Sequence, residues 1–190
     1  MKTRRELFPL AIAPFLPALV AESAFGQTIP RPADELIIST LTGGRLNVNA
    51  MKGKVVCVEL LLTWCSHCQA SAKVLQDLYT ELKPKGFEVV GAATNTDAAK
   101  AKEDIGGFMG VTNAKFPIGW ITQDQTFRFL QSPMGKLLSF PQLVLIDRKG
   151  NIVYQHTGEV DADALRAEIM KALSAPAGSP AARSAKKAGV

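Results

Sequence analysis

Two cysteines separated by two residues are the clearest chemical feature of the sequence. They lie in the run Trp64-Cys-Ser-His-Cys68, directly after an apolar stretch and directly before a segment with helical periodicity. A thiol at the first turn of a helix faces unpaired backbone N–H groups and the positive end of the helix dipole, and both favour the thiolate. Because one helical turn brings Cys68 back towards Cys65, the pair can alternate between dithiol and disulfide by exchange with another protein's cysteines.

Two other uses of such a pair need ligands that the chain does not offer. A structural zinc site takes about four ligands, whereas the chain has three Cys and two His and no second paired motif. Covalent haem attachment takes Cys-x-x-Cys-His, and the residue after Cys68 is Gln69. We therefore expect a redox pair with no metal and no cofactor. Cys57, inside the apolar stretch, is expected to be a buried small hydrophobe.

A carboxylate interrupts the apolar stretch before the motif. Glu59 lies within residues 55–62, where every other side chain is apolar. Burying a carboxylate is costly unless it is paired or functional, and burial raises its pKa. Glu59 is therefore a candidate to take the proton from Cys68 when Cys68 attacks a mixed disulfide. The alternative is a carboxylate at the edge of the strand, paired with a lysine.

The other motif residues are candidates for tuning. Ser66 and His67 separate the cysteines, and a cationic neighbour stabilises the thiolate and makes the disulfide more oxidising. The alternative for His67 is an exposed polar residue without such an effect. Trp64 is expected to pack beside the motif and shape a docking surface.

The elements that position these residues follow from hydrophobic periodicity and from turn residues. The expected strands cover residues 36–40, 45–49, 55–62, 87–93, 116–121, 142–147 and 152–156, and the expected helices cover 66–82, 97–109, 123–130 and a segment opened by Asp161. Strand–helix–strand alternation followed by a hairpin and a helix predicts an α/β layer fold, with the first crossover right-handed and its strands parallel.

The two ends of the chain differ from its centre. The 190 residues carry a net charge of +5, but residues 27–173 account for only +1. This balance does not support a nucleic-acid groove in the folded part. Residues 174–190 lack apolar periodicity and are expected to form a disordered basic tail.

Residues 1–26 have the pattern of an export signal. Lys2, Arg4 and Arg5 precede the apolar stretch 7–20, and small residues stand before Gln27. The run from Thr3 to Phe8 resembles a twin-arginine signal. The alternative is an uncleaved membrane anchor, although a spanning helix needs about 20 apolar residues. We therefore expect a periplasmic or otherwise extracytoplasmic protein that contacts a membrane only if the signal is uncleaved.

Two segments resemble one known family. The runs Met51–Cys68 and Phe140–Val153 are similar to the TlpA/ResA-type thioredoxin-like proteins, which are extracytoplasmic thiol–disulfide oxidoreductases, and the similarity covers about residues 33–173. It implies a thioredoxin-like fold, with a central mixed β-sheet flanked by helices and an N-terminal β-hairpin. It also implies Cys65 as nucleophile and Cys68 as resolving cysteine. The implied partners are protein thiols and disulfides and an upstream redox protein, with the chain a monomer.

The resemblance also points to a proline facing the motif. Pro141 matches the family's cis proline by its place before the penultimate strand, and Pro117, also preceded by Phe, is its rival. Because proline has no N–H, Phe140 can offer its backbone edge to an extended substrate. The sequence departs from the family at Leu60-Leu61, where an aromatic pair is usual, and at Ser71, where one branch has an acid.

Two other functions remain open at this point. The first is a thiol peroxidase of the AhpC/TSA type, whose pattern places Thr three residues before the reactive cysteine, where this chain has Leu62. A peroxide-dependent sulfenic acid would identify it. The second is a non-catalytic module that delivers a metal, which copper binding without turnover would identify.

Overall fold

The structure is a computed structural model, and it describes residues 28–176. The expected export signal, residues 1–26, and residues 177–190 of the expected basic tail lie outside the described residues, whereas Ser174, the first residue of that tail, is the last residue of the C-terminal helix. Within residues 28–176, no helix combines the length and apolar character needed to cross a membrane.

An eight-stranded mixed sheet forms the centre of the molecule, in the order β1-β8-β7-β4-β5-β6-β2-β3. Its strands are β1 (Arg31–Pro32), β2 (Ile37–Thr40), β3 (Arg45–Asn47), β4 (Val55–Leu61), β5 (Phe87–Ala93), β6 (Ile118–Trp120), β7 (Gln142–Ile146) and β8 (Asn151–Thr157). The helices are α1 (Ser66–Leu82), α2 (Ala101–Thr112), α3 (Gln123–Leu130) and α4 (Ala162–Ser174), with short 3-10 helices η1 (Val48–Ala50) and η2 (Lys83–Lys85).

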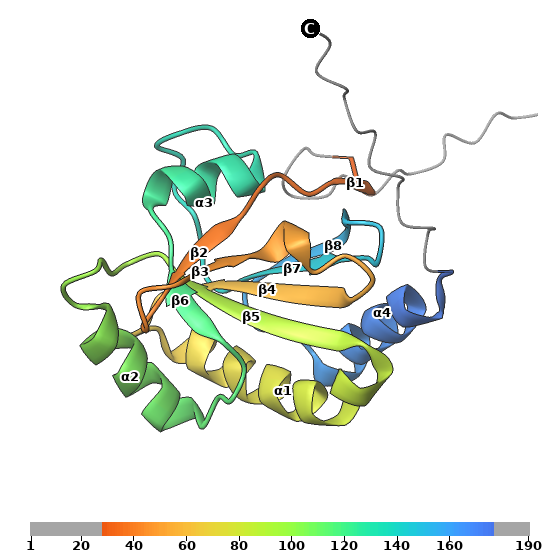
Figure 1. The fold of residues 1–190 in the computed structure, drawn as a ribbon, viewed down its shortest axis with the longest axis horizontal. Helices are drawn as coiled ribbons and strands as arrows, with labels where there is room; N and C mark the ends of the chain where they lie inside the picture. Colours follow the sequence, from red (N-terminus) through yellow and green to blue (C-terminus); the bar gives the residue numbers. More distant parts are fainter. Residues whose placement is uncertain (1–27, 177–190) are drawn as a thin grey trace, which may run out of the picture.

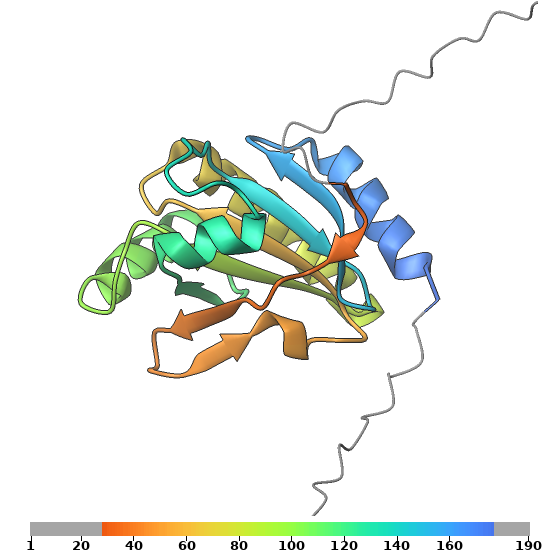
Figure 2. The same cartoon turned by 90° about the horizontal axis from the view of Figure 1, so that it is seen from above.

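The helices cover both faces of this sheet. Helices α1, α2 and α4 pack on one face, and α3 lies over the other together with the segment around β2 and β3 (Figures 1 and 2). The β2–β3 pair is the expected N-terminal hairpin, and β4 pairs parallel with β5, as the crossover rule predicts. The expected thioredoxin-like fold is confirmed.

Strand β4 is buried along its whole length, because it lies between β5 and β7 and has helices on both sides. Its side chains alternate between the two faces. Val56, Val58 and Leu60 join the core beneath α3, and Cys57 and Leu61 join the core beneath α1. The same alternation places Glu59 on the α1 face of the sheet.

Two local features differ from the sequence-based prediction. Asp97 does not begin a helix directly: its Oδ1 accepts hydrogen bonds from Ala99 N at 2.9 Å and Lys100 N at 3.1 Å, and α2 begins at Ala101. A side chain that closes a turn in this way competes with helix formation. Strand β1 lies in a segment for which the sequence predicts no strand. It pairs with β8 at the edge of the sheet, where a proline is tolerated.

Gly119 allows β2 and β6 to pair closely, and Gly119→Ala is expected to destabilise the protein by about 3 kcal/mol, the cost of severe overpacking. An added Cβ would overlap Ser39 O and lie 2.7 Å from Ile38 Cγ2, so β2 would have to separate from β6. Gly106→Ala is the matched control, because its Cβ meets nothing within 4 Å. That change in a helix should stabilise by about 0.5–1 kcal/mol. Urea denaturation measures both values, and equal stabilities for the two variants would contradict this account.

Candidate active site

Cys65 and Cys68 lie together at the junction between β4 and α1. Cys65 is the N-cap of α1, and its Sγ accepts a hydrogen bond from Cys68 N at 3.4 Å. Cys65 is partly exposed, Cys68 is fully buried, and both thiols are free. Burial is the main reason why the pKa of Cys68 is raised, and the nearby Cys65 and Glu59 raise it further. One sulfur is therefore accessible at the surface, and the thiol behind it is held in its protonated form.

Glu59 is fully buried on the α1 face of the sheet. Neither carboxyl oxygen has a hydrogen-bond partner among the described residues, and no ion pair to Glu59 is present there. The alternative of an edge carboxylate paired with a lysine is therefore wrong. Burial raises the pKa of Glu59 to about 8, with Ser71 acting in the opposite direction and Cys65 adding to the rise.

A carboxyl group with this pKa can both accept and donate a proton near neutral pH. Electrostatic coupling links Glu59 to both cysteines. The buried Ser71 hydroxyl has no partner within hydrogen-bond distance among the described residues. Ser71 thus places a neutral group beside Glu59, at the position where one branch of the resembled family has an acid.

His67 is held by a residue that the sequence analysis missed. Its Nδ1 lies 2.5 Å from Glu159 Oε1, and both side chains are mostly exposed. The backbone oxygen of Glu159 in turn contacts His156 Nε2 at 2.8 Å. No local signal could have identified Glu159, because it stands in the connection between β8 and α4, far from the motif in sequence.

The Phe140–Pro141 peptide bond is cis. The only other cis peptide within residues 28–176 precedes Pro30, so the rival Pro117 is trans. Strand β7 runs antiparallel to β4, with Gln142 opposite Leu60. This register places Pro141 at the same sheet edge as the end of β4 and the cysteine motif.

Trp64 is 72% exposed, so it packs less closely beside the motif than expected and stays available for the predicted docking surface. The turn that carries it is fixed instead through Thr63. Asn95 Oδ1 accepts a hydrogen bond from Thr63 N at 3.0 Å, and Asn95 Nδ2 donates to Thr63 Oγ1 at 2.9 Å. Asn95 follows β5, which ends beside β4, so the parallel pairing brings it to this turn.

An apolar cleft of about 330 Å³ lies beside the end of β4. Its apolar walls come from Leu62, from Phe127 of α3, and from Leu137 and Phe140 in the connection between α3 and β7. Polar side chains complete the lining, and they are Thr94, Gln123, Thr126 and Lys136. Leu137 is 93% exposed. This cleft is not predictable from the sequence, because the connection has neither periodicity nor a motif.

Within residues 28–176, no three His, Cys, Asp or Glu side chains are grouped so that they could hold a metal ion. The metal-delivery alternative therefore has no such donor set in this part of the chain.

Comparisons with known proteins agree with this geometry. The Redoxin family model matches residues 25–173. The chain is 27% identical over 180 residues to the thiol-disulfide oxidoreductase ResA of Bacillus thuringiensis, covering 90% of this chain and 98% of that protein.

Solved structures have the same architecture. A putative thiol:disulfide interchange protein DsbE from Chlorobium tepidum superposes with a TM-score of 0.64 at 27% identity, covering 76% of this chain and 96% of that one. The thioredoxin domain of a Bacteroides vulgatus thiol-disulfide oxidoreductase gives a TM-score of 0.63 at 25% identity, covering 76% and 97%. The chain belongs to the Redoxin family and is a thioredoxin-like thiol–disulfide oxidoreductase of the TlpA/ResA type.

Proposed function

We propose that Cys65 and Cys68 form the redox pair of an extracytoplasmic enzyme that exchanges disulfides with protein substrates. One observation carries the proposal. Cys65 caps α1 at the surface and accepts the N–H of Cys68, whose thiol is buried behind it. This arrangement separates an accessible nucleophile from a protected resolving thiol. The pattern of residues 1–26 supports the extracytoplasmic location.

The reaction is a pair of thiol–disulfide exchanges. The Cys65 thiolate attacks a substrate disulfide, forms a mixed disulfide and releases one substrate sulfur as a thiolate. Cys68 then gives its proton to the ionised Glu59 carboxylate and attacks Cys65 Sγ. The second substrate sulfur leaves and takes up a proton, so two electrons pass from the cysteine pair to the substrate. The same steps in reverse oxidise a substrate dithiol.

The substrate side of the site is apolar and extended. The cleft beside β4 presents Leu137 and Phe140. The exposed Trp64 follows β4, at the same end of the strand. A polypeptide segment lying along residues 140–141 can place apolar side chains in the cleft while its disulfide reaches Cys65. We therefore infer that substrates carry apolar residues close to the exchanging cysteine.

Reaction of the reduced chain with glutathione disulfide tests the identity of the pair. Peptide mapping should find one disulfide, between Cys65 and Cys68, and Cys57 should remain alkylatable after unfolding because it is fully buried in the native state. A rapid sulfenic acid formed with peroxide, without exchange, would instead support the thiol peroxidase alternative. A disulfide that includes Cys57 would contradict the proposal.

His67→Ala is expected to lower the reduction potential of the pair by about 30 mV, a tenfold change in the equilibrium with glutathione. His67 stands in the first turn of α1, two residues after Cys65, and its Nδ1 contacts Glu159. A cationic imidazole at this place stabilises a neighbouring thiolate. Alkylation of thiols at defined glutathione ratios gives the potential. Lys73→Ala, which removes an exposed cation further along α1, is the control. Equal potentials for the two variants would show that His67 has no tuning role.

A further inference from the structure

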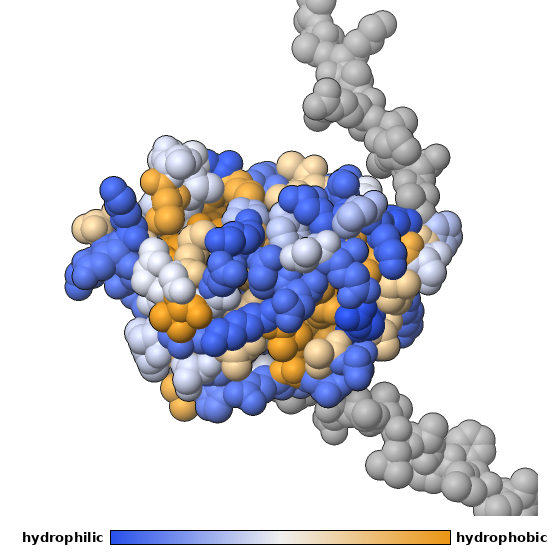
Figure 3. Space-filling model, turned by 90° about the horizontal axis from the view of Figure 1, so that it is seen from below, coloured by the Kyte–Doolittle hydropathy of each residue, from blue (hydrophilic) through white to orange (hydrophobic). Residues whose placement is uncertain are grey.

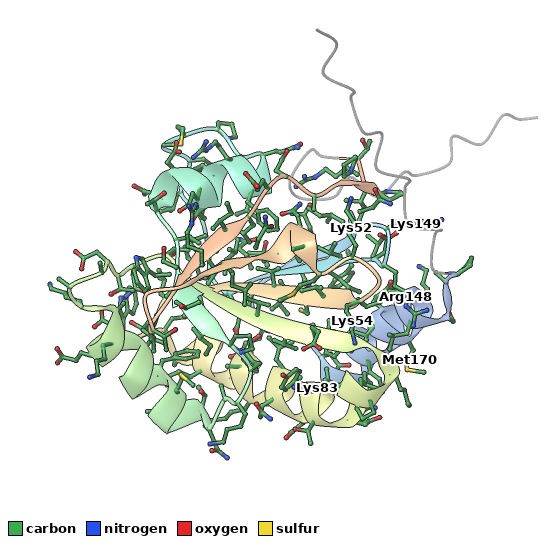
Figure 4. All side chains as sticks on the ribbon, viewed as in Figure 1. Lys52, Lys54, Lys83, Arg148, Lys149 and Met170 are labelled. Carbon is green, nitrogen blue, oxygen red and sulfur yellow. The ribbon has the colours of Figure 1, made fainter. Side chains whose placement is uncertain are left out.

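Six basic side chains gather at one end of the molecule, although residues 27–173 carry a net charge of only +1. They come from three connections: the turn before β4, the 3-10 helix η2, and the turn between β7 and β8. We call this set the basic end, and it consists of Lys52, Lys54, Lys83, Lys85, Arg148 and Lys149. Figure 4 shows Lys52, Lys54, Arg148 and Lys149 at the same end of the ribbon, whereas Lys83 lies lower, beside α1, with its Nζ over the Tyr79 ring.

The topology of the sheet explains this gathering. Strands β4 and β5 are parallel, so both begin at this end, and β7 is antiparallel to β4, so it finishes here. Two of the side chains meet at Gly86, where a Cβ would lie 3.9 Å from both Arg148 Nη2 and Lys54 Cδ. Arg148 Nη2 also donates to Lys85 O at 3.5 Å.

Most of these charges have no acidic partner. Within residues 28–176, none of the six forms an ion pair. Few acids lie near these six side chains, and those that do also make contacts of their own. Glu81 pairs with Arg166 and also interacts with Lys85, and the Asp147 carboxylate accepts backbone N–H groups of its own turn. Glu88 acts on Lys83, whose Nζ donates to Tyr79 Oη at 2.6 Å.

The basic end lies opposite the cysteine motif. Lys54 immediately precedes β4 and the motif follows it, so the seven residues of the strand separate the two by about 20 Å. A partner bound at the basic end therefore leaves Cys65 and the apolar cleft accessible.

Both ends of the described chain also lie here. Ile29 and Ala175 line one recess, and Arg148 Nη1 donates to Ala175 O at 3.4 Å. Beyond these points the sequence has further cations, with the apolar stretch 7–20 on the N-terminal side. Those cations are Lys2, Arg4, Arg5, Arg183, Lys186 and Lys187.

We propose that the basic end docks on the surface of an anionic phospholipid bilayer and turns the redox site away from it. Lysines attract an anionic lipid surface as point charges, and stable attachment combines basic charge with an apolar element. A recess of about 270 Å³ is lined by Lys52, Lys54 and Lys149 and by one acid, Asp147, whose Oδ1 accepts two backbone N–H groups of its own turn. The three lysines leave it a net positive charge that can receive a lipid phosphate. The exposed Ile29 lines a second recess that shares Asp147 with the first, and the exposed Met170 is drawn at the same end of the molecule as Arg148 (Figure 4).

Other occupants fit less well. Single-stranded nucleic acid binds by stacking on aromatic side chains, and within residues 28–176 the strongly exposed aromatic side chain is Trp64, at the opposite end. The face seen from the side of α1 is mostly hydrophilic, with apolar residues in scattered areas (Figure 3).

Vesicle co-sedimentation of the full chain tests the proposal. The readout is binding to phosphatidylcholine vesicles that contain phosphatidylglycerol, relative to binding to phosphatidylcholine alone. Each lysine near the surface contributes about fivefold to such binding. The triple variant Lys52→Gln, Lys54→Gln and Lys149→Gln should therefore bind the phosphatidylglycerol vesicles about 100-fold more weakly than the wild type. High salt should weaken the binding of the wild type to a similar extent.

The matched control is Lys73→Gln, Lys102→Gln and Lys115→Gln, which removes the same charge from exposed positions elsewhere. It should retain the excess binding. Equal losses in the two triple variants, or no excess for the wild type, would overturn the proposal. So would a loss of duplex DNA binding in the basic-end variant while vesicle binding persists.

The orientation is tested separately by glutathione disulfide. Vesicle-bound wild-type protein should react at the same rate as free protein, because Cys65 faces away from the bilayer. Slower reaction only on vesicles would overturn the orientation. Failure of the free protein to react would count against the proposed redox function, and not against lipid binding.

Discussion

Cys68→Ser is expected to convert a catalytic reaction into stoichiometric capture of one substrate per molecule. In this variant Cys65 still attacks a substrate disulfide, because its position as the N-cap of α1 does not depend on the Cys68 thiol; the bond it accepts comes from the backbone N–H. The mixed disulfide then persists, since a serine hydroxyl does not resolve it. A disulfide-containing peptide with apolar flanking residues, followed by non-reducing mass spectrometry, should show one adduct on Cys65.

Two further variants make this result specific. Cys57→Ser in the Cys68→Ser background should leave the yield of adduct unchanged, because Cys57 is fully buried within β4. Cys65→Ser in the same background should remove the adduct. An adduct on Cys57, or none on Cys65, would show that the nucleophile has been wrongly assigned.

Glu59→Gln is expected to abolish most of the pH dependence of stability between about pH 5 and pH 8. The pKa of Glu59 rises from its ordinary value of 4.5 to about 8 in the folded protein, because burial disfavours the carboxylate. In this window the folded state holds a proton that the unfolded state has released, so the wild type loses stability as pH rises. The full loss is on the order of 5 kcal/mol. The glutamine side chain is neutral over the whole pH range, so the variant does not lose this stability as pH rises.

Urea denaturation of the reduced protein over this pH range measures the effect. Asp77→Asn, which removes an exposed carboxylate of α1, is the control and should follow the wild-type curve. Parallel curves for wild type and Glu59→Gln would mean that Glu59 does not hold a proton in the folded protein. The same variant should also accumulate mixed disulfide, because losing a positioned general base slows resolution by about 100-fold.

Local features of the chain were predictable from sequence. Helix α3 begins and ends where its periodicity indicates, because Thr122 and Gln125 form a capping box at its start. Helix α1 also has the expected bounds, because Pro84 and Gly86 follow it and end the helical periodicity. The proximity of the two cysteines could also be predicted from the sequence, since it depends on only one helical turn.

Features that depend on distant parts of the chain were not predictable. Glu159 reaches His67 only because the β8–α4 connection returns to the motif, and the residues are 92 positions apart. The apolar cleft exists because the α3–β7 connection lies beside Leu62. Aromatic residues usually bury their surface, so packing is the ordinary expectation for Trp64. Its exposure was not predictable, because the turn that carries it is held by bonds between Thr63 and the distant Asn95.

The antiparallel pairing of β4 with β7 has a consequence for the order of events at the ribosome. Cys65 emerges before Phe140, Pro141 and the strands that follow them, so the nucleophile is made long before its recognition surface. Because domains are synthesised from the N-terminus, a nascent chain exposes a reactive sulfur without a binding cleft. Selectivity towards other proteins therefore begins only when the last third of the domain has joined the sheet.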